Sequence, residues 1–578
     1  MKTTRFISIV ILLASLFVGC NPDESIIKES HPARTGKHTT VCAKLTFDKD
    51  FYALSRAIAH EMAGDSSQSN HSGVTRAVDA DGHKYYQIGD RTMLVYKTLD
   101  GKTHTTLSTP YDQAQLDSLG DDAAYFFWDV DDDCDETVDF TVVFPATRCD
   151  SVTGAIKYAN MSKQDGTLAW VSDMDVATFT GSWDYMYTPK AIPLNNPLTV
   201  CKFTITNESG NDITNSVTDL RISDGYHEYV ITRQAAPGPI FVLMQAVKKK
   251  NILFTSKIGD THYVKYVKKK TLEAGNLYPI TVEMKAPDLH NGPLPGIFAK
   301  IIYKDGRPHG YRYFCFAPGN LRATTTNKGE NWSWSFAPNQ WDYLGRGDLN
   351  LKLRPSMTGY CGKNGTVDLF GWSSEKNYYG IAADEADFSL FRGNFRDWGD
   401  VFDSHMRWST LSYEDWESVL FSDNKTPESY SIVNGVNEAH FAKGTVNGTH
   451  GLILFPEVYI QPAGVKAPEA INDRRSASGW NNNRYQGDDW TRMEVAGAVF
   501  LPAAGMRTDE TSYQEGVGKY WTSSSDEKPD SRFSLQHSEL LEFNETNLNP
   551  RDLGFRHYGC SVRLIKILSS SEAHELLK

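Results

Sequence analysis

Short runs in which hydrophobic and polar residues alternate dominate residues 39–286. A period of two is typical of a β-strand with one buried face, since successive side chains point to opposite sides of a sheet. The clearest runs are residues 41–47, 93–97, 140–144, 198–205 and 274–284. The pattern predicts a mainly β fold, with a first set of strands before residue 190 and a second set after it.

Residues 251–257 and 262–268 flank Ile258-Gly259-Asp260, and this arrangement predicts a β-hairpin. Lysines cluster at its outer ends, at residues 248–250 and 268–270. Such clusters can form basic binding sites. More often lysine marks the solvated end of a strand, where it discourages pairing with another edge, and we expect that role here.

One helix is expected in this half of the chain, over residues 54–62. Leu54, Ile58 and Met62 share a face, and Gly64 is a suitable residue for ending the helix.

The composition changes across residues 287–296, which form a linker. Three prolines and two glycines between Ala286 and Gly296 are incompatible with a helix or a central strand. Ten of the thirteen tryptophans lie after residue 330, so the second half has a different core. We expect residues 297–568 to fold alone, with few contacts across the linker.

A second helix is predicted from Ser412 onward. Ser412 and Asp415 have the spacing of a capping box, and Trp416, Val419 and Leu420 form one apolar face. The adjacent acids Glu414 and Asp415 could be compared with the carboxylates of a glycosidase. They are explained more simply as the polar face of this helix.

Residues 39–286 resemble the fimbrillin (Mfa-like) lipoproteins of Bacteroidales. The resemblance is carried by the early amphipathic strand, Met93-Leu-Val-Tyr-Lys-Thr-Leu-Asp-Gly, Leu198-Thr-Val-Cys-Lys-Phe-Thr-Ile and Ala274-Gly-Asn-Leu-Tyr-Pro-Ile-Thr-Val-Glu-Met. It implies two transthyretin-like β-sandwiches, residues 39–190 and 191–286, that assemble by strand exchange.

Residues 297–568 resemble the C-type-lectin-like modules of the Fibrobacter major-domain type. The matching segments are Phe316-Ala-Pro-Gly-Asn-Leu, Phe336-Ala-Pro-Asn-Gln-Trp-Asp-Tyr-Leu, Val367-Asp-Leu-Phe-Gly-Trp, Gly497-Ala-Val-Phe-Leu-Pro-Ala-Ala-Gly, Tyr520-Trp-Thr-Ser-Ser-Ser and Gly559-Cys-Ser-Val-Arg-Leu-Ile. The resemblance implies an α+β domain with a tryptophan-rich core, followed by a tail at 569–578. The related sulfatase-modifying oxygenases need a close pair of cysteines, whereas only Cys560 lies in the corresponding region.

The first residues predict a lipoprotein signal. Lys2 and Arg5 precede a short apolar run that ends in Gly19-Cys20, which resembles a lipobox. Residues 1–19 would be removed, Cys20 would carry the lipid, and residues 20–38 would be a tether; a plain signal peptide is the alternative. Acidic residues just after Cys20 resemble the surface-export signal of Bacteroidales, which predicts a surface-exposed lipoprotein of the outer membrane.

Charge and cysteine usage narrow the functional classes. A net charge of −13 argues against nucleic acid as a partner, because such binding needs basic patches. The seven cysteines after Cys20 form no CxxC pair, and most are expected to be small buried hydrophobes. No HExxH, GxSxG or GxxxxGK[ST] segment occurs, so we expect no enzyme activity and no cofactor.

Two segments carry candidate ligand groups. The acids of residues 129–136 could bind Ca²⁺, but Cys134 and Phe140 occupy the positions where an EF-hand needs Gly and Glu, which favours a solvated acidic loop. The second segment resembles the Asn/Asp ligand sets of some C-type lectins. A sugar-binding role is considered for Trp480, Asn481, Asn482, Asn483, Asp488 and Asp489, with an Asn-rich turn as the alternative.

In the fimbriae that the first half resembles, a protease cuts after a basic residue and removes the first strand. Arg34 precedes that strand and Arg56 lies in the expected helix. Arg76 follows a polar segment of the kind in which proteolysis concentrates, so cleavage is predicted between Arg76 and Ala77. The second sandwich runs directly into residues 297–568, which leaves no strand there to donate.

The sequence therefore predicts a non-enzymatic cell-surface adhesin, as a tip or minor subunit of a fimbria. Its partners would be fimbrial shaft subunits, the outer membrane through the lipid, and an external surface glycan or protein bound by the C-terminal domain. The alternative is an outer-membrane lipoprotein that captures glycans for uptake. A hydrolase is the least favoured reading.

Overall fold

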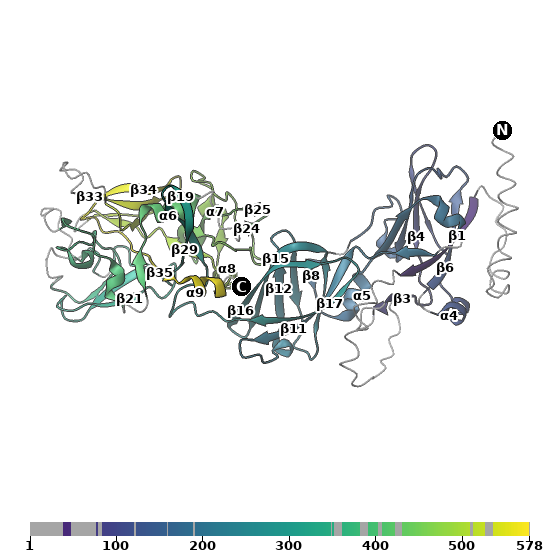
Figure 1. Cartoon of the computed structure of the whole chain (residues 1–578), viewed down its shortest axis with the longest axis horizontal. Coiled ribbons are helices and arrows are strands. Elements are labelled where there is room, and N and C mark those ends of the chain that lie inside the picture. Colours follow the sequence, from purple (N-terminus) through teal and green to yellow (C-terminus); the bar gives the residue numbers. More distant parts are fainter. Residues whose placement is uncertain are drawn as a thin grey trace. The chain divides into compact units, whose positions relative to one another are not determined.

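The computed structural model describes most of the chain between His38 and Leu576. The described residues are 38–47, 77–78, 84–120, 123–158, 160–188, 191–347, 349–351, 361–381, 391–402, 407–421, 431–508, 512–525 and 536–576. This part of the chain is mainly β, with many small sheets and a few short helices (Figure 1). None of its helices has the length and apolar character needed to cross a bilayer.

The chain forms two compact units, which are described separately. Unit 1 consists of Met1–Thr218, Ile231–Lys250 and Lys270–Val282. Unit 2 consists of Asp219–Val230, Asn251–Lys269 and Glu283–Lys578. The predicted second sandwich, residues 191–286, is thus divided between the units. The domain types assigned from the sequence stay predictions.

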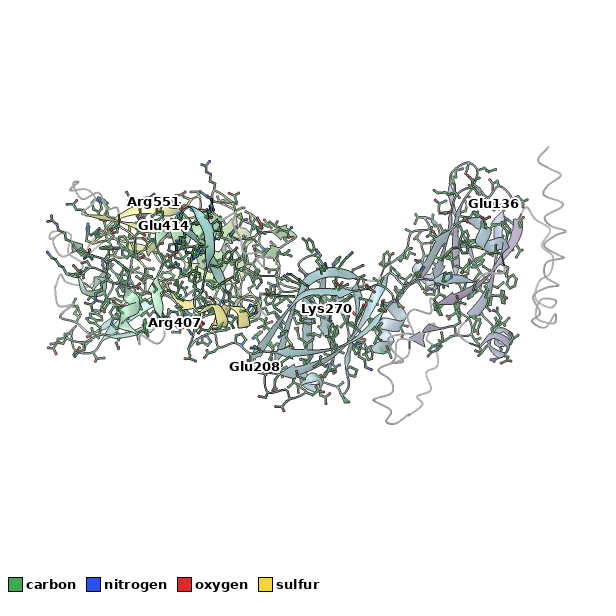
Figure 2. All side chains as sticks on the ribbon, in the orientation of Figure 1. Glu136, Glu208, Lys270, Arg407, Glu414 and Arg551 are labelled. Atoms are coloured by element: carbon green, nitrogen blue, oxygen red, sulfur yellow. The ribbon has the colours of Figure 1, made fainter. Side chains whose placement is uncertain are left out.

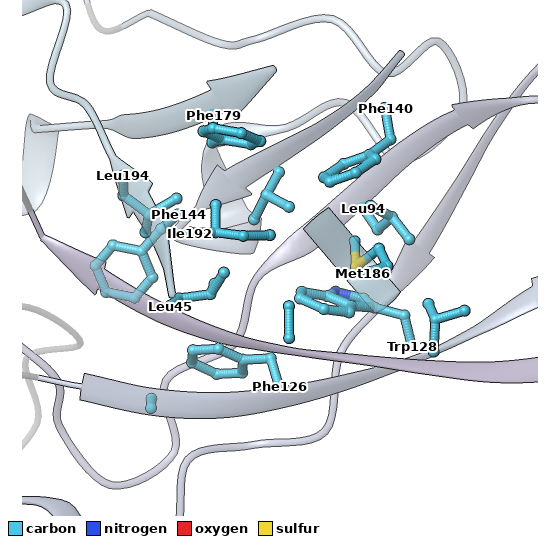
Figure 3. Packing of buried hydrophobic residues seen from close by; sticks show 14 of the residues in the cluster. Leu45, Leu94, Phe126, Trp128, Phe140, Phe144, Phe179, Met186, Ile192 and Leu194 are labelled. Atoms are coloured by element: carbon cyan, nitrogen blue, oxygen red, sulfur yellow. The ribbon is translucent and has the colours of Figure 1, made fainter. Parts of the chain in front are cut away.

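Unit 1 begins with two sheets that share one apolar core. The strands are β1 (His38–Phe47), β4 (Met93–Lys97), β5 (Thr103–Leu107), β6 (Ala123–Asp131), β7 (Phe140–Phe144), β9 (Ala177–Gly181) and β10 (Ile192–Leu194). One sheet has the order β10-β1-β6 and the other β5-β4-β7-β9. Leu45 and Trp128 of the first sheet pack with Leu94 and Phe140 of the second (Figure 3). The strands expected at 41–47, 93–97 and 140–144 are confirmed.

A further sheet of unit 1 has the order β14-β11-β17. The remaining elements of this part of the chain are β2 (Ala77–Val78), β3 (Lys84–Tyr85), α4 (Gln113–Leu119), η2 (Ala146–Arg148), β8 (Lys163–Gln164), α5 (Leu168–Met174), η3 (Trp183–Tyr187), β11 (Leu198–Asn207), η4 (Thr214–Ser216), β14 (Ile240–Gln245) and β17 (Leu277–Met284). Met93 and Val143 pack against Leu198 and Leu243 of this sheet. The strands expected near 198–205 and before residue 284 are confirmed.

The predicted hairpin is also confirmed. Its strands are β15 (Val247–Ile258) and β16 (Thr261–Leu272), and they neighbour β12 (Asp219–Ser223) and β13 (Glu228–Thr232) in the order β16-β15-β12-β13. Gly259 adopts a φ of 60° in the turn, a conformation that glycine accepts without strain. Lys268–Lys270 lie near the end of β16, an edge strand, as expected for lysines that limit edge pairing. Lys248–Lys250 lie at the start of β15, an inner strand between β16 and β12, so that role does not fit the second cluster.

The rest of unit 2 contains short strands and helices. Its strands are β18 (Phe298–Lys304), β19 (Arg307–Phe316), β20 (Leu321–Thr325), β21 (Ser333–Phe336), β22 (Gly365–Val367), β23 (Trp408–Thr410), β24 (Ile432–Val433), β25 (Val436–Asn437), β26 (Phe441–Val446), β27 (Thr449–Leu454), β28 (Arg484–Tyr485), β29 (Val499–Pro502), β30 (Met506–Arg507), β31 (Tyr513–Gln514), β32 (Gly518–Trp521), β33 (His537–Phe543), β34 (Leu548–Phe555) and β35 (Leu564–Leu568). Its helices are η5 (Tyr378–Gly380), η7 (Trp398–Val401), α6 (Tyr413–Phe421), α7 (Gly479–Asn482), α8 (Gly487–Val495) and α9 (Ser570–Leu576).

These strands form several separate sheets. The larger ones have the orders β18-β19-β35-β23, β28-β26-β27-β29, β21-β20-β22 and β32-β33-β34. The core between them is rich in tryptophan, and the fully buried ones are Trp372, Trp398, Trp416, Trp490 and Trp521. Trp408 and Trp480 are also buried, so seven of the ten tryptophans after residue 330 are core residues and the predicted tryptophan-rich core is confirmed.

Helix α6 begins with the predicted capping box. The Asp415 N–H donates to Ser412 Oγ at 3.2 Å, and the Ser412 N–H donates to Asp415 Oδ2 at 2.9 Å. Trp416 and Leu420 are buried as expected. The placement of Asp415 on a polar face is wrong, because its carboxylate is buried and ion-paired with Lys300 at 2.8 Å and with Arg312. A buried carboxylate needs such partners.

Residues 570–576 of the predicted tail form helix α9. Ser569 begins it, since its Oγ accepts from the Glu572 N–H at 3.3 Å and its own N–H donates to Glu572 Oε2 at 2.7 Å. Ala573 is buried against Ile297, Cys315 and Leu568. The predicted tail is therefore part of the folded unit.

The seven cysteines from Cys42 to Cys560 are free thiols. Five are buried and two, Cys42 and Cys134, are half-buried. Burial raises the pKa of Cys560 to about 12, so this thiol is neutral at physiological pH. The expectation that most cysteines act as small hydrophobic core residues is confirmed.

Contacts between residues on either side of the 287–296 linker are numerous within unit 2. Arg492 lies 3.1 Å from Asp219, and the Ile460 N–H donates to Tyr266 Oη at 2.7 Å. The Tyr226 hydroxyl donates to Asn437 Oδ1 at 3.0 Å. The expectation of few contacts across the linker is wrong, because β12, β13, β15 and β16 pack with the segments that follow it.

Candidate functional sites

The first strand, β1, lies between two other strands of its sheet. It pairs antiparallel with β6 over nine residue pairs, from His38–Asp131 to Thr46–Ala123. On its other side it pairs in parallel with β10, where Leu45 is opposite Ile192. Both backbone edges of β1 are therefore used, and its removal would leave two strand edges facing an open gap.

The side chains of β1 alternate between the core and the outside. Val41, Ala43, Leu45 and Phe47 are buried in the core of unit 1, whereas the residues between them are half-buried. Burying a large aliphatic or aromatic side chain contributes about 1.5–3 kcal/mol. The strand thus supplies a row of apolar groups that any replacement would have to match.

Of the residues predicted to take part in lipid attachment and cleavage, only Ala77 is among the described residues. Cys20 and Arg76 lie outside the described residues, and so does the helix expected at 54–62. Ala77 begins β2 and pairs with Tyr85 of β3. Lipid attachment at Cys20 and cleavage between Arg76 and Ala77 stay predictions.

The acidic run at 129–136 is engaged in hydrogen bonds. Asp131 accepts from the Tyr96 hydroxyl at 2.8 Å and lies 2.8 Å from His104 Nδ1. Asp129 accepts from Thr40 Oγ1 at 2.7 Å, and Glu136 from the Tyr187 hydroxyl at 2.6 Å. Among the residues that the structure describes, no three His, Cys, Asp or Glu side chains gather as a set of metal ligands.

The predicted sugar-binding residues Trp480 to Asn483 lie on and next to α7. Trp480 is buried, stacks on His450 at 4.8 Å and donates from Nε1 to Gly451 O at 3.0 Å. Asn483 is 1% exposed and donates to Lys443 O at 2.8 Å. These two side chains support the fold.

The neighbouring Asn481 and Asn482 are exposed and lie in α7 itself. Asn482 Nδ2 donates to Glu469 Oε2 at 2.9 Å, and Asn481 O accepts from Arg484 Nε at 3.0 Å. A sugar-binding role for this segment stays a prediction.

The other two predicted ligands, Asp488 and Asp489, lie in the first turn of α8 and not in a loop. Negative side chains are stabilised there by the helix dipole. Asp488 contacts Lys257 at 2.9 Å, His262 at 2.7 Å and Arg492 at 2.8 Å. Burial would raise the pKa of Asp488, but these three partners outweigh it and hold the pKa below its ordinary value.

A polar pocket that the sequence did not predict lies at the start of α6. Its volume is about 350 Å³. The lining residues are Gly393, Asn394, Phe395, Tyr413, Glu414, Ser523, Ser524, Ser525, Glu539 and Arg551. Glu414 and Arg551 are labelled in Figure 2. The one sequence feature that could have indicated the pocket is the run of three serines at residues 523–525. The other lining residues come from four segments that are distant in the sequence.

Comparison with known proteins gives weak structural likenesses only. No protein-family profile matches the chain, and no curated protein matches it. A fimbrial assembly protein from Parabacteroides distasonis is 9% identical, with 48% of this chain and 94% of that chain covered and a TM-score of 0.23. The C-terminally truncated tip fimbrial protein Mfa3 from Porphyromonas gingivalis is 9% identical, with 43% and 98% covered and a TM-score of 0.21.

A fimbrial protein from Bacteroides ovatus covers more of the chain. It is 10% identical, with 85% of this chain and 96% of that chain covered, and a TM-score of 0.18. TM-scores this low do not establish a common fold, and identities near 10% assign no function. The functional argument therefore depends on the residues and geometry of this chain.

Proposed function

We propose that the protein is a non-enzymatic cell-surface adhesin, built into a fimbria as a tip or minor subunit by strand exchange. The observation that supports the proposal is the position of β1 in the middle of the sheet β10-β1-β6. This strand lies before Arg76 in the chain, whereas β6 and β10 lie after it. A cut after Arg76 would release the central strand and keep both neighbours.

Release of β1 would leave a groove that only a segment with matching backbone hydrogen bonds and apolar side chains could fill. The N–H and C=O groups of β6 and β10 that face β1 would lose their partners, and unpaired buried backbone groups are costly. The apolar residues that cover Leu45 and Phe47 would be exposed. An extended segment from a neighbouring subunit, with apolar residues at alternate positions, would restore both kinds of contact.

The described residues toward the C-terminal end of the chain offer no comparable strand. Strand β17 lies at the edge of its sheet beside β11, and the chain continues from it into β18, so it has no free end. Strand β35 lies between β19 and β23, so it is hydrogen-bonded on both sides. A subunit of this kind would accept a strand and donate none, which is what the end of a filament requires.

Lipid attachment at Cys20 fits the same scheme. The lipid would hold the precursor at the outer membrane, and cleavage after Arg76 would remove the lipid together with β1. The fimbrial shaft subunits would supply the replacing strand. The domain after residue 297, for which we propose a C-type-lectin-like fold, would bind the external partner.

Cleavage after Arg76 and the position of the protein along the filament are tested on sheared fimbriae. N-terminal sequencing should give Ala77 as the first residue, and immunogold should label filament ends. Arg76→Ala should abolish cleavage and incorporation, whereas the matched variant Arg34→Ala should leave both unchanged. Intact Cys20-linked protein confined to the membrane would contradict the proposal and favour the glycan-capture lipoprotein.

The groove is tested with a peptide of the β1 sequence, HTTVCAKLTF. It should rebind the cleaved protein, and the Leu45→Asp peptide should not, because Leu45 is fully buried. The Lys44→Asp peptide should bind, since Lys44 points out of the core. Equal binding of the two variant peptides would show that binding in the groove does not depend on the alternation of apolar and polar residues along the peptide.

A further inference from the structure

We infer that the polar pocket at the start of α6 binds a neutral carbohydrate. The inference rests on the proposed adhesive function, for which it names the site and class of ligand. The pocket has a volume of about 350 Å³, which lies at the small end of the range of ~300–1,000 Å³ found for ligand pockets. That size suits one or two sugar rings of a surface glycan.

The serine wall of the pocket is fixed by backbone contacts. The Ser523 N–H donates to Leu411 O at 2.9 Å, and the Tyr413 N–H donates to Ser524 Oγ at 3.2 Å. The Glu539 N–H donates to Ser524 O at 3.2 Å. These bonds join the serine loop to the start of α6 and to β33, so the wall is formed before any ligand arrives. A preformed wall lowers the entropy lost on binding.

Arg551 lines a further part of the pocket. Its Nε donates to Glu539 Oε1 at 2.7 Å, and its guanidinium lies 4.2 Å from the centre of the Tyr413 ring. Glu539 is 2% exposed, so the ion pair anchors an exposed arginine to a buried acid. The guanidinium has further N–H donors in a fixed plane, which suits recognition of hydroxyl oxygens.

Glu414 is an exposed residue that contributes a carboxylate to the lining of the pocket. Partial burial acts to raise the pKa of Glu414, but hydrogen bonds with Ser412 and Tyr413 outweigh it and the pKa is lowered. The group is therefore ionised at neutral pH. An ionised carboxylate accepts hydrogen bonds from sugar hydroxyls, and charge-assisted bonds of this kind are among the stronger ones.

The charges of the lining residues select against other ligands. Two carboxylates, Glu414 and Glu539, and one guanidinium line the pocket, and that guanidinium is already ion-paired with Glu539. A sialylated, sulfated or uronic-acid glycan would bring a further negative charge into this field. An apolar ligand would find few partners, because Arg551 covers the face of the Tyr413 ring.

A neutral sugar avoids each of these conflicts. Its hydroxyls both donate and accept, which matches a carboxylate and a guanidinium in the same pocket. Serine hydroxyls at 523–525 supply groups of both kinds, and so does the exposed Asn394 amide, whose Nδ2 also donates to Glu375 Oε1 at 3.1 Å. The pocket is separate from the segment at 480–489, so it is an independent candidate for ligand recognition.

The test uses the whole purified chain on an array of neutral oligosaccharides, each printed beside its sialylated or uronic-acid counterpart. We expect binding to one or more neutral members and weaker binding to the acidic counterparts. The strongest neutral oligosaccharide is then titrated by calorimetry against Glu414→Gln and Asn394→Ala. Each variant should weaken binding at least tenfold without a change in melting temperature.

Glu330→Gln is the matched control, because it removes the same charge from an exposed position that does not line the pocket. It should bind like the wild type. Preference for acidic glycans, binding of a lysine-rich peptide in place of neutral sugars, no binding at all, or binding by Glu414→Gln and Asn394→Ala that equals the wild type would each overturn the inference. Cleavage after Arg76 and incorporation into filaments are measured on the same variants and should be unaffected, so failure of this site is distinguishable from failure of the assembly proposal.

Discussion

Arg492 of α8 forms an ion pair with Asp219 of β12, at 3.1 Å, although 273 positions separate them in the chain. The arginine side chain is 1% exposed and also contacts Asp488 at 2.8 Å. His262 and Lys257 complete this cluster around Asp488. The cluster joins strands that precede the 287–296 linker to a helix that follows it, within unit 2.

Replacing Arg492 with Met should lower the free energy of unfolding by about 2 kcal/mol. Breaking a buried ion pair costs ~3–5 kcal/mol, and the cost is smaller here because Asp219 and Asp488 are partly solvated. Urea unfolding followed by tryptophan fluorescence measures the change. The control Arg484→Met alters an exposed arginine of the same region and should change stability by less than about 0.5 kcal/mol. Equal effects would show that the cluster does not stabilise unit 2.

A fragment of residues 297–568 should be less stable than one of residues 191–568. The shorter fragment lacks β12, β13, β15 and β16, and with them Asp219, His262 and Tyr266. Scanning calorimetry should give a lower melting temperature for the shorter fragment. Equal melting temperatures would restore the expectation of an independent domain after the linker.

Glu494 should make stability depend on pH. Burial raises the pKa of Glu494 from 4.5 to about 7, despite the hydrogen bond from Gln340 Nε2 at 2.9 Å. Between pH 4.5 and 7 the folded state therefore binds this proton more tightly than the unfolded state. Stability decreases as the pH rises through that window and stays reduced above it.

The variant Glu494→Gln removes this titration. It should be more stable than the wild type above pH 7, by on the order of 3 kcal/mol, since one pKa unit corresponds to about 1.4 kcal/mol. The difference should vanish near pH 4, as measured by urea unfolding across the range. Glu417→Gln, at an exposed position, should give no such pH-dependent difference; a constant difference for Glu494→Gln would contradict the explanation.

Loss of the capping box of α6 should lower the free energy of unfolding by a smaller amount. Ser412→Ala removes the acceptor of the Asp415 N–H and should cost about 1 kcal/mol. Thermal unfolding monitored by near-ultraviolet dichroism measures it, because Trp416 lies on the same helix. Ser418→Ala, further along α6, serves as the comparison and should be nearly neutral.

Cys20→Ser tests the lipid anchor. A lipobox needs the cysteine thiol as the acylated group, so the variant should be uncleaved or soluble and should carry no lipid. Metabolic labelling with palmitate measures attachment directly. A labelled product from the variant would contradict the lipobox assignment, whatever the fate of the rest of the chain.

Local patterns determined the elements of the fold. The alternation in 41–47 predicted β1, and the turn at Gly259 predicted the hairpin of β15 and β16. The spacing of Ser412 and Asp415 predicted the start of α6. These features were readable because each depends on residues a few positions apart, within one strand, turn or helical turn.

Tertiary structure alone decided the sites. Asp488 and Asp489 looked like ligands in a loop, yet the fold places them on α8, where Asp488 meets Lys257 and His262. The polar pocket joins residues near 394, 413, 524, 539 and 551, and no local pattern connects them. The packing of whole sheets decides which distant side chains become partners. The sequence alone shows which groups are present, and only the fold shows which of them lie together.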